Sequence, residues 1–443
     1  MSQTTQHTDA TENDAARVRD SKYVWHPWSR NEAERDRLMI VRGKGSRVWD
    51  AAGREYIDAS SLNSTVGYGN EDVIAAATEQ LRTLHGVDMS ATNHPVAGRL
   101  AEVLAGHLPE SLSRTLLLNS GSEGIEAALM IASCYRRITG DPRNRVITFA
   151  QGYHGSTVLT RTLSGLVPTG HPFQQPIEVT RVALPLPAAE LRTPEAAKVL
   201  AAAFAEALAD GDAPLAVVIE PFLNVGGGIV LPPGFLTELR ALCDDASALL
   251  IFDEIFTGYG RTGKMFAFQH EGAAPDILVS SKGLGAGYAP ISAVTARQDI
   301  YAAFADDEII GGLRYGHTTA GHATAGAVAI ATLGVMEREG LVENAEDRGR
   351  ELLKLIEPLR TLPGVVDTRG LGLVGVVEMA DMATAAALVV SCQEHGLMVR
   401  QQAASVLICP PLTLTSAEVE EIAERITTAT RALASEQSTE QSI

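Results

Sequence analysis

The sequence predicts an α/β fold, in which a large domain holds a mostly parallel sheet and a small α+β domain is attached to it. The main observation is that helical periods alternate with short apolar runs from about residue 71 to residue 330. This pattern is typical of parallel strands joined by crossover helices. The chain length of 443 residues also exceeds one simple core and fits two or three interlocked domains.

The expected elements follow from these periods. Alternating residues between Met39 and Asp58, punctuated by glycines, indicate a small antiparallel meander. Helices are then expected at 72–85, 95–107, 123–138, 195–210 and 234–246, and strands at 115–118, 145–149, 216–220, 248–252, 276–280 and 291–295. After residue 330 we expect a long helix to about 360, a glycine-rich strand segment at 370–378, a helix at 382–395, strands near 397–409 and a last helix at 416–434.

These elements divide the chain into five segments. We expect a disordered tail at 1–20 and an N-terminal segment at 21–70 that joins the small domain. The large domain spans 71–330, the small domain spans 331–435, and a polar tail follows at 436–443.

Composition excludes several classes of partner. A net charge of −18 repels nucleic acid and anionic lipid. The four cysteines form no Cys-x-x-Cys pair and no zinc-like cluster, which favours isolated thiols in a reducing compartment and no metal. The first twenty residues carry no apolar signal segment. The uncharged stretch from Tyr315 to Met336 is too rich in alanine, glycine and threonine for a membrane span. We therefore expect a cytoplasmic protein.

Two predicted strands of the large domain end in residues that carry chemistry. The apolar run Pro275–Val279 leads through two serines into Lys282, and the run Ala248–Phe252 leads into Asp253. Because parallel strands end at the same edge of a sheet, the amine and the carboxylate are expected to share a crevice. Pyridoxal phosphate needs this pair, namely a lysine for its Schiff base and an acid that keeps its ring nitrogen protonated.

Other strand ends point to the same crevice. Asn119–Glu123 follows a predicted strand and opens a helix, whose free N–H groups can bind phosphate, although a plain helix cap explains the same residues. Tyr153 follows the strand 145–149 and can stack on a flat ring, or it is a buried loop aromatic. Glu220 ends another strand and faces either the crevice or solvent.

The motifs together resemble a known family. The run Asp253–Gly263, followed by Ser281–Leu284, resembles the signature of class III (ω-type) pyridoxal-phosphate aminotransferases. Further family motifs occur in the same order, over roughly residues 23–430: Trp25-His26-Pro27, Gly121-Ser122-Glu123, Tyr153-His154-Gly155, Glu220-Pro221 and Pro410-Pro411-Leu412. The resemblance implies the aspartate-aminotransferase-like fold, known as fold type I.

The resemblance also implies residue roles. Lys282 would bind the cofactor covalently and shuttle a proton, and Asp253 would hold the ring nitrogen. The other implied cofactor contacts are Tyr153 and Ile255 on the two ring faces, Ser120, Gly121 and Ser122 at the phosphate, and His154 and Glu220 beside them. Thr318 matches a threonine that reaches the phosphate from the partner subunit, which implies a homodimer (or a tetramer built from it) with the site at the interface. From the residues alone, Thr318 is only a loop hydroxyl.

Substrate contacts are expected from Arg400, Trp28 and Asn63. Arg400 matches a mobile arginine of members that use carboxylate donors, and a surface strand arginine is the alternative.

The chain also departs from relatives at several positions. Val225 stands where ornithine-type enzymes carry glutamate, and Phe256 replaces a glutamine used by some members. The segment Ser60–Thr65 is short and lacks a tryptophan, which suggests a wider or more polar wall. Trp25–Trp28 resembles the start of diaminopelargonate aminotransferases, but the missing tryptophans argue against that substrate.

The sequence thus indicates an aminotransferase that works by a ping-pong cycle between an amino-acid or ω-amine donor and an aldehyde or ketone acceptor. An aminomutase or a decarboxylating transaminase of the same fold is the alternative, and a catalytically silent cofactor-binding homologue is a more remote one.

Overall fold

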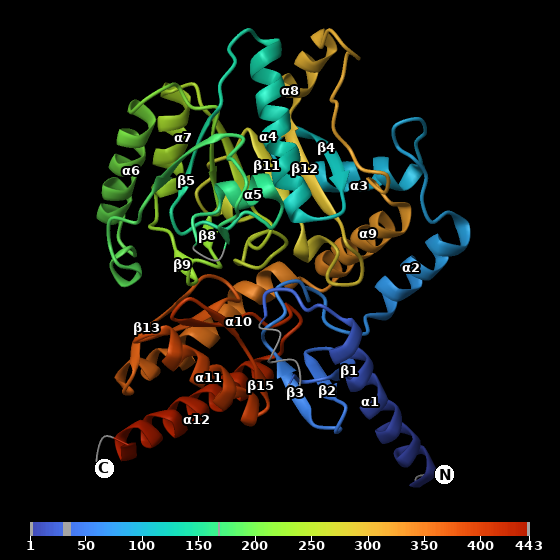
Figure 1. The fold of residues 1–443 in the computed structure, drawn as a ribbon, viewed down its shortest axis with the longest axis vertical. Helices are drawn as coiled ribbons and strands as arrows, with labels where there is room; N and C mark the ends of the chain where they lie inside the picture. The colour runs from blue at the N-terminus through green and yellow to red at the C-terminus, as the bar shows by residue number, and fades with distance from the viewer. Residues whose placement is uncertain (1–2, 30–36, 167–168, 441–443) are drawn as a thin grey trace.

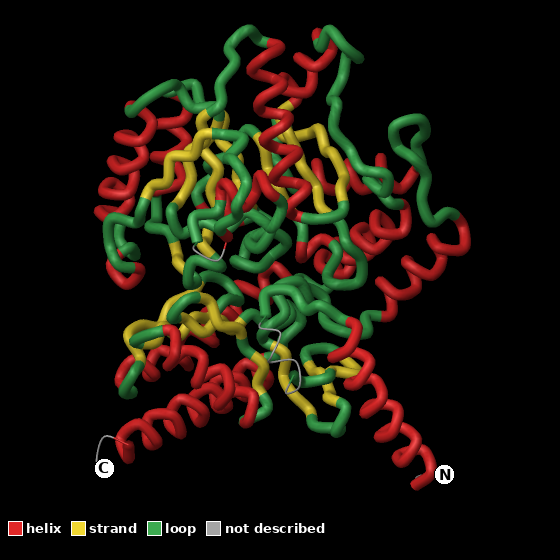
Figure 2. The backbone as a smooth tube through the Cα atoms, in the orientation of Figure 1, coloured by secondary structure: helices red, strands yellow, loops and turns green. Residues whose placement is uncertain are grey.

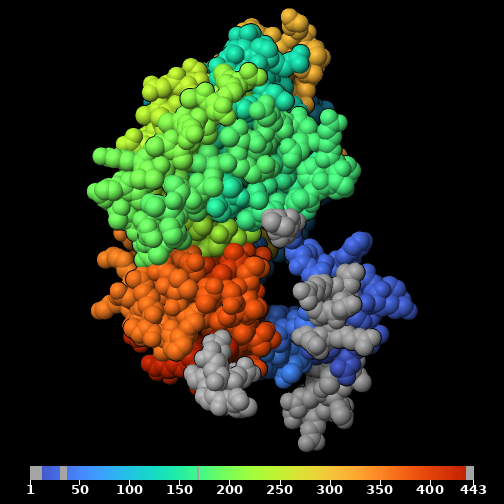
Figure 3. Space-filling view, turned by 60° about the vertical axis from the view of Figure 1, so that its left-hand side comes forward, coloured from blue at the N-terminus to red at the C-terminus, as the bar shows by residue number. Residues whose placement is uncertain are grey.

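The computed structural model describes residues 3–29, 37–166 and 169–440 of the chain. A large α/β part is built from the middle of the chain, and a smaller part is formed by its two ends (Figure 1). In Figure 2 the strands of the large part lie at its centre with helices on both sides. On the face seen in Figure 3, the surface below the large part is hollowed between the C-terminal region and the N-terminal segment.

The helices are α1 Gln3–Tyr23, α2 Glu71–Thr83, α3 Pro95–Ala105, α4 Gly121–Ile138, α5 Val158–Leu163, α6 Pro194–Ala209, α7 Phe235–Asp245, α8 Gln298–Ala303, α9 Ala323–Arg338, α10 Leu341–Ile356, α11 Met382–Glu394 and α12 Ser416–Glu440. The strands are β1 Ile40–Lys44, β2 Arg47–Asp50, β3 Glu55–Asp58, β4 Leu112–Leu118, β5 Arg145–Phe149, β6 Glu178–Val182, β7 Ala216–Ile219, β8 Phe222–Leu223, β9 Ile229–Val230, β10 Leu249–Asp253, β11 Ile277–Ser280, β12 Ser292–Arg297, β13 Val365–Gly370, β14 Gly375–Met379, β15 Leu397–Met398, β16 Arg400–Gln402 and β17 Ser405–Ile408.

A seven-stranded sheet, called the central sheet below, forms the core of the large part. Its order is β4-β12-β11-β10-β7-β5-β6, and only β12 runs antiparallel to its neighbours. Strands β5, β7, β10 and β11 are buried along their whole length, as parallel strands covered on both faces must be. Burial of one large side chain such as Phe252 contributes about 1.5–3 kcal/mol. The predicted, mostly parallel α/β fold is confirmed.

The two ends of the chain build the smaller part together. The C-terminal sheet has the order β13-β14-β17-β16 and is antiparallel throughout. The N-terminal sheet has the order β1-β2-β3-β15, in which β15 pairs in parallel with β3. Residues 40–58 and 397–398 therefore meet in one sheet.

Local signals in the sequence set several helix ends. Asn70, Thr193 and Asp381 each accept a hydrogen bond from a backbone N–H in the first turn of α2, α6 and α11. Pro194 opens α6, at a position where its missing N–H costs no hydrogen bond.

Three segments differ from the sequence expectations. Residues 3–23, expected in large part as a disordered tail, form α1, whose alanines and arginines are good helix formers. The single long helix expected to about residue 360 is two helices, α9 and α10, separated at Gly340, where the φ of +59° is left-handed and ends the first helix. Helix α12 continues to Glu440, and residues 1–2 and 441–443 of the expected tails lie outside the described residues.

The uncharged stretch from Tyr315 to Met336 is a loop followed by most of α9. This helix packs against α2 and α3 and buries residues such as Val328 and Leu333. Among the described residues, no helix combines the length and the apolar character needed to cross a membrane.

Candidate active site

The candidate site lies at one edge of the central sheet, where several strands end. Asp253 is the last residue of β10, Lys282 stands two residues after β11, and Glu220 follows β7. These residues line one pocket of about 210 Å³. Its walls comprise Gly121, Ser122, Tyr153, His154, Gly155, Glu220, Asn224, Val225, Asp253, Ile255, Phe256, Ser281 and Lys282. The pocket thus brings together eight of the residues that were predicted to contact the cofactor, namely Gly121, Ser122, Tyr153, His154, Glu220, Asp253, Ile255 and Lys282.

The backbone at Lys282 is strained. Its φ is +27°, a value that costs a residue with a side chain about 1–3 kcal/mol and persists only where the surroundings impose it. The next residue must be glycine, because a Cβ on Gly283 would lie 2.9 Å from Tyr259 Cβ and 3.0 Å from Thr65 Oγ1. The tight turn after β11 therefore fixes where the lysine enters the pocket.

The amine of Lys282 lies in a protein environment that favours its neutral form. Desolvation in the crevice lowers the pKa of Lys282, the negative charges of Asp253 and Glu220 partly oppose this shift, and the positive charge of Arg400 adds to it. The Nζ atom stands 5.8 Å from the centre of the Phe256 ring. A neutral amine is the form that can attack a carbonyl carbon.

Asp253 is oriented by a buried histidine. His154 Nδ1 lies 2.8 Å from Asp253 Oδ2, and His154 Nε2 lies 2.9 Å from Thr148 Oγ1. Because a carboxylate only accepts hydrogen bonds, Nδ1 must carry the proton. The backbone N–H of Ile255 donates to Asp253 Oδ1 at 3.2 Å. With Asp253 only 4% exposed, these donors hold a carboxylate in one orientation at the floor of the pocket.

Glu220 is a second buried carboxyl group beside Asp253. It accepts hydrogen bonds from the backbone N–H of Tyr153 at 2.9 Å and of Asn224 at 3.3 Å. The pKa of Glu220 is raised to about 7, chiefly because the group is buried; the charge of Asp253 adds to this rise, while His154 and the two N–H groups oppose it.

The N-terminus of α4 forms the wall on the β4 side of the pocket. Ser120 caps the helix by accepting from the N–H of Glu123, whose side chain in turn accepts from the N–H of Ser120. Gly121 comes so close to Ile255 that a Cβ there would lie 2.7 Å from Ile255 Cδ1. The free N–H groups and positive dipole end of this helix suit an anion. Ser120 itself serves as the cap and is not among the pocket walls.

The remaining predicted residues lie outside the pocket walls. Trp28 is 60% exposed and packs edge-on against the Tyr153 ring, with centroids 6.2 Å apart. The amide of Asn63 borders Gly287 in the turn after Lys282. Arg400 is exposed at the start of β16.

Thr318 is likewise exposed, in the loop before α9. Its neighbour Thr319 donates to Asn119 Oδ1 at 3.0 Å, next to the start of α4. The structure thus brings this loop close to α4 without adding Thr318 to the pocket walls of its own chain.

The pocket walls also include Asn224 and Ser281, to which sequence reasoning gave no role, and Val225 and Phe256, which it noted only as departures from relatives. Ser281 and Phe256 are adjacent or close to residues that were singled out, so position after a strand end was the available signal. Asn224 and Val225 follow the short strand β8, and only the fold brings that segment beside Asp253.

Comparison with known proteins identifies the family of the chain. Residues 29–430 match the aminotransferase class-III family. The adenosylmethionine-8-amino-7-oxononanoate aminotransferase of Geobacter sulfurreducens is 30% identical over 427 residues, covering 90% of this chain and 94% of that protein. The taurine–pyruvate aminotransferase of Rhodobacter capsulatus is 31% identical over 470 residues, covering 97% of this chain and all of that protein.

Solved transaminase structures have the same fold as this chain. The omega transaminase from Pseudomonas jessenii in complex with PMP superposes with a TM-score of 0.89 at 30% identity, covering 94% of this chain and 97% of that chain. The chain therefore belongs to the class III aminotransferases. It is a pyridoxal-phosphate-dependent aminotransferase of fold type I, as the sequence motifs predicted.

Proposed function

We propose that the pocket around Lys282 and Asp253 is the active site, and that it transfers an amino group from an amino-acid or ω-amine donor to an aldehyde or ketone by a ping-pong cycle. The observation that carries this proposal is the meeting of a lysine, a buried carboxylate and a helix N-terminus in one pocket. The family defines the reaction class, and the residue roles follow from the resemblance together with the geometry of the pocket.

The residues present fit pyridoxal phosphate. The helix end at Gly121 and Ser122 suits the phosphate, and Asp253 suits a protonated ring nitrogen. Tyr153 and Ile255 provide a flat aromatic and an aliphatic surface for the ring. The buried Oδ1 of Asn224 has no hydrogen-bond partner within the described chain, which marks this wall as one built to meet a polar group.

Each residue then has a defined task. When bound, the cofactor supplies an electron sink for the carbon that loses its proton. Lys282 anchors the cofactor and moves a proton at its Nζ atom. Asp253, held by His154, stabilises positive charge at the ring nitrogen. The buried walls exclude water from the reacting carbon.

The proposed range of amino donors rests on two residues, Arg400 and the uncharged Val225. The exposed Arg400 can grip a carboxylate in a bidentate fork, and its position at the start of a strand leaves it free to swing away for an uncharged amine. Val225, which lines the pocket, is uncharged. We infer that carboxylate donors and neutral amines are both accepted.

We further propose a cytoplasmic homodimer, with a large domain over 71–330 and a small domain over 331–435 joined by 21–70. The exposed Thr318 loop beside α4 supports a site completed by Thr318 of a second subunit. Size measurement by light scattering, together with the activity of mixed inactive variants, tests the dimer. A fully active monomer would contradict it.

Lys282→Ala tests the proposed function directly. The purified wild-type protein with added pyridoxal phosphate should show a visible absorption band that a panel of amines converts. We expect the variant to lack the lysine-dependent band, because Lys282 is the one lysine among the described residues that line the pocket. Lys264→Ala, at a half-exposed lysine paired with Glu346 at 3.7 Å, is the matched control and should keep it. A band that persists in Lys282→Ala would assign the wrong lysine.

A further inference from the structure

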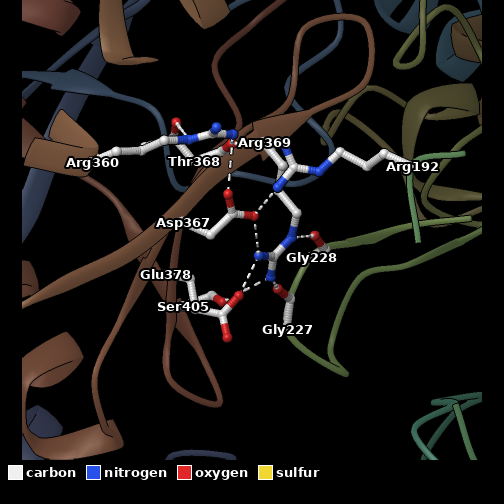
Figure 4. A network of polar contacts seen from close by, with 9 residues as sticks. All are labelled: Arg192, Gly227, Gly228, Arg360, Asp367, Thr368, Arg369, Glu378 and Ser405. Atoms are coloured by element: carbon white, nitrogen blue, oxygen red, sulfur yellow. Dashed lines mark hydrogen bonds and ion pairs between the residues drawn. The ribbon is translucent and has the colours of Figure 1, made fainter. Parts of the chain in front are cut away.

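The side chain of Arg369 joins the C-terminal sheet to a segment that lines the pocket. Arg369 lies in β13 and is only 5% exposed. Its Nε donates to the carbonyl oxygen of Gly228 and its Nη2 to that of Gly227, each at 2.7 Å (Figure 4). Nη2 also donates to Ser405 Oγ at 3.3 Å. One guanidinium group therefore holds two consecutive carbonyl groups of the large part.

Two acids fix the other end of this guanidinium. Nη1 donates to Asp367 at 3.1 Å and to Glu378 (Figure 4). The five contacts match the five N–H donors of the group, so none is left over. Asp367 also pairs with Arg192, which precedes α6 in the large part, and with Arg360. Charge-assisted hydrogen bonds thus hold Arg369 from two sides.

The segment Asn224–Gly228 depends on outside contacts for its path. Gly227 and Gly228 have φ values of +118° and +65°, which favour glycine. A Cβ on Gly226 would lie 2.5 Å from the carbonyl oxygen of Gln151, so the segment is also tightly packed. Glycines permit this path but do not enforce it, because their backbone is the most flexible. Hydrogen bonds from the N–H groups of Gly227 and Gly228 to the carbonyl oxygen of Asn224 close the turn, and the carbonyl contacts of Arg369 anchor it to the C-terminal sheet.

The other end of the segment enters the pocket. Asn224 and Val225 line it, and Asn224 is only 1% exposed. The N–H of Asn224 donates to Glu220, while its carbonyl oxygen accepts from the N–H of Gly228 at 3.0 Å. A shift of the two glycine carbonyls therefore moves the wall that carries Asn224 and the partner of Glu220. Arg369 itself does not line the pocket.

We propose that Arg369 is a positioning residue, which sets the Asn224–Val225 wall of the cofactor pocket from the C-terminal sheet. The proposal rests on the proposed function, because it takes the pocket around Lys282 as the cofactor site. It makes the C-terminal sheet part of the machinery that shapes the ring environment, although no residue of that sheet lines the pocket.

Arg369→Gln tests the proposal, with Arg360→Gln as the matched control. Both changes remove an arginine that pairs with Asp367, but only Arg369 contacts the glycine carbonyls. The readouts use holoenzyme without substrate: the Kd for pyridoxal phosphate and the pH dependence of the bound cofactor's absorbance. We expect Arg369→Gln to weaken the cofactor at least tenfold and to shift the absorbance curve. Arg360→Gln should leave both within twofold of wild type.

Arg369→Lys separates charge from geometry. A lysine keeps the positive charge but cannot hold two carbonyls and two acids in a planar fork, so we expect it to resemble Arg369→Gln. If Arg369→Gln melts at a lower temperature yet keeps the wild-type Kd and absorbance curve, the residue is merely structural and the proposal fails.

Glu378→Gln covers the case in which the arginine variants do not fold. Glu378 is partly exposed, so its replacement is milder, and it loosens the guanidinium without deleting it. Amide hydrogen exchange in the holoenzyme should speed up in the peptide spanning 222–230, whereas Arg360→Gln should not change it. Equal exchange in all three proteins would overturn the proposal. If the wild-type protein binds no pyridoxal phosphate, the proposed function itself is contradicted.

Discussion

Replacing Glu220 with glutamine tests the electrostatics of the pocket in the cofactor-free protein. Burial raises the pKa of Glu220 from an ordinary 4.5 to about 7. Since each pKa unit corresponds to about 1.4 kcal/mol, the protonated form gains about 3 kcal/mol relative to the unfolded chain. Glutamine removes the titration while keeping nearly the same shape and the acceptor for the Tyr153 N–H.

The sign of the effect follows from proton linkage. The folded protein binds the Glu220 proton more tightly than the unfolded chain, so the stabilisation is complete below about pH 4.5 and is lost as the pH rises through about 7. The wild-type protein should therefore lose about 3 kcal/mol of stability relative to Glu220→Gln across that window. Glu254, whose pKa burial also raises to about 7, titrates in both proteins and cancels in the difference.

Urea unfolding of both proteins at a series of pH values measures this difference. The exposed Glu238 supplies the control, because Glu238→Gln should reproduce the wild-type profile. If the wild-type and Glu220→Gln stabilities stay parallel from about pH 4.5 to about 7, Glu220 does not carry the raised pKa and the argument about its burial is refuted.

Three further substitutions probe separate parts of the site. Asp253→Asn keeps the shape but removes the buried charge; we expect turnover to fall by orders of magnitude with the cofactor still bound, and unchanged turnover would refute its role. Gly121→Ala puts a methyl group 2.7 Å from Ile255 Cδ1 and should weaken cofactor binding in an equilibrium titration, whereas Gly98→Ala, where a Cβ meets nothing within 4 Å, should not. Arg400→Ala should raise KM for carboxylate donors in steady-state assays but not for simple amines; an equal change for both would contradict a carboxylate grip.

The sequence predicted the chemistry-bearing strand ends because their signals are local. The apolar runs before Asp253 and Lys282 fixed two buried strands, and parallel pairing of β10 and β11 brings their ends to one edge. The cap at Ser120 was equally visible in a short stretch of residues. The apolar pattern and the family motifs therefore both placed the pocket at these strand ends.

The contacts that the sequence did not reveal join distant segments. Nothing local indicates that Arg369 reaches Gly227, because β13 and the segment after β8 lie far apart in the chain. The edge-on contact of Trp28 with Tyr153 depends in the same way on how the N-terminal segment folds back. The break at Gly340 was missed because a single glycine between two stretches of helix-forming residues can also lie inside a continuous helix.

The pairing of β15 with β3 has a consequence for biosynthesis. Ile57 leaves the ribosome early, but its sheet partner Leu397 is made only when most of the chain has been translated. The edge of β3 therefore stays unpaired while the middle of the chain is synthesised. Unpaired strand edges promote aggregation during this period. A nascent chain that terminates before residue 397 should keep this edge exposed and be recognised by chaperones, whereas full-length synthesis closes it.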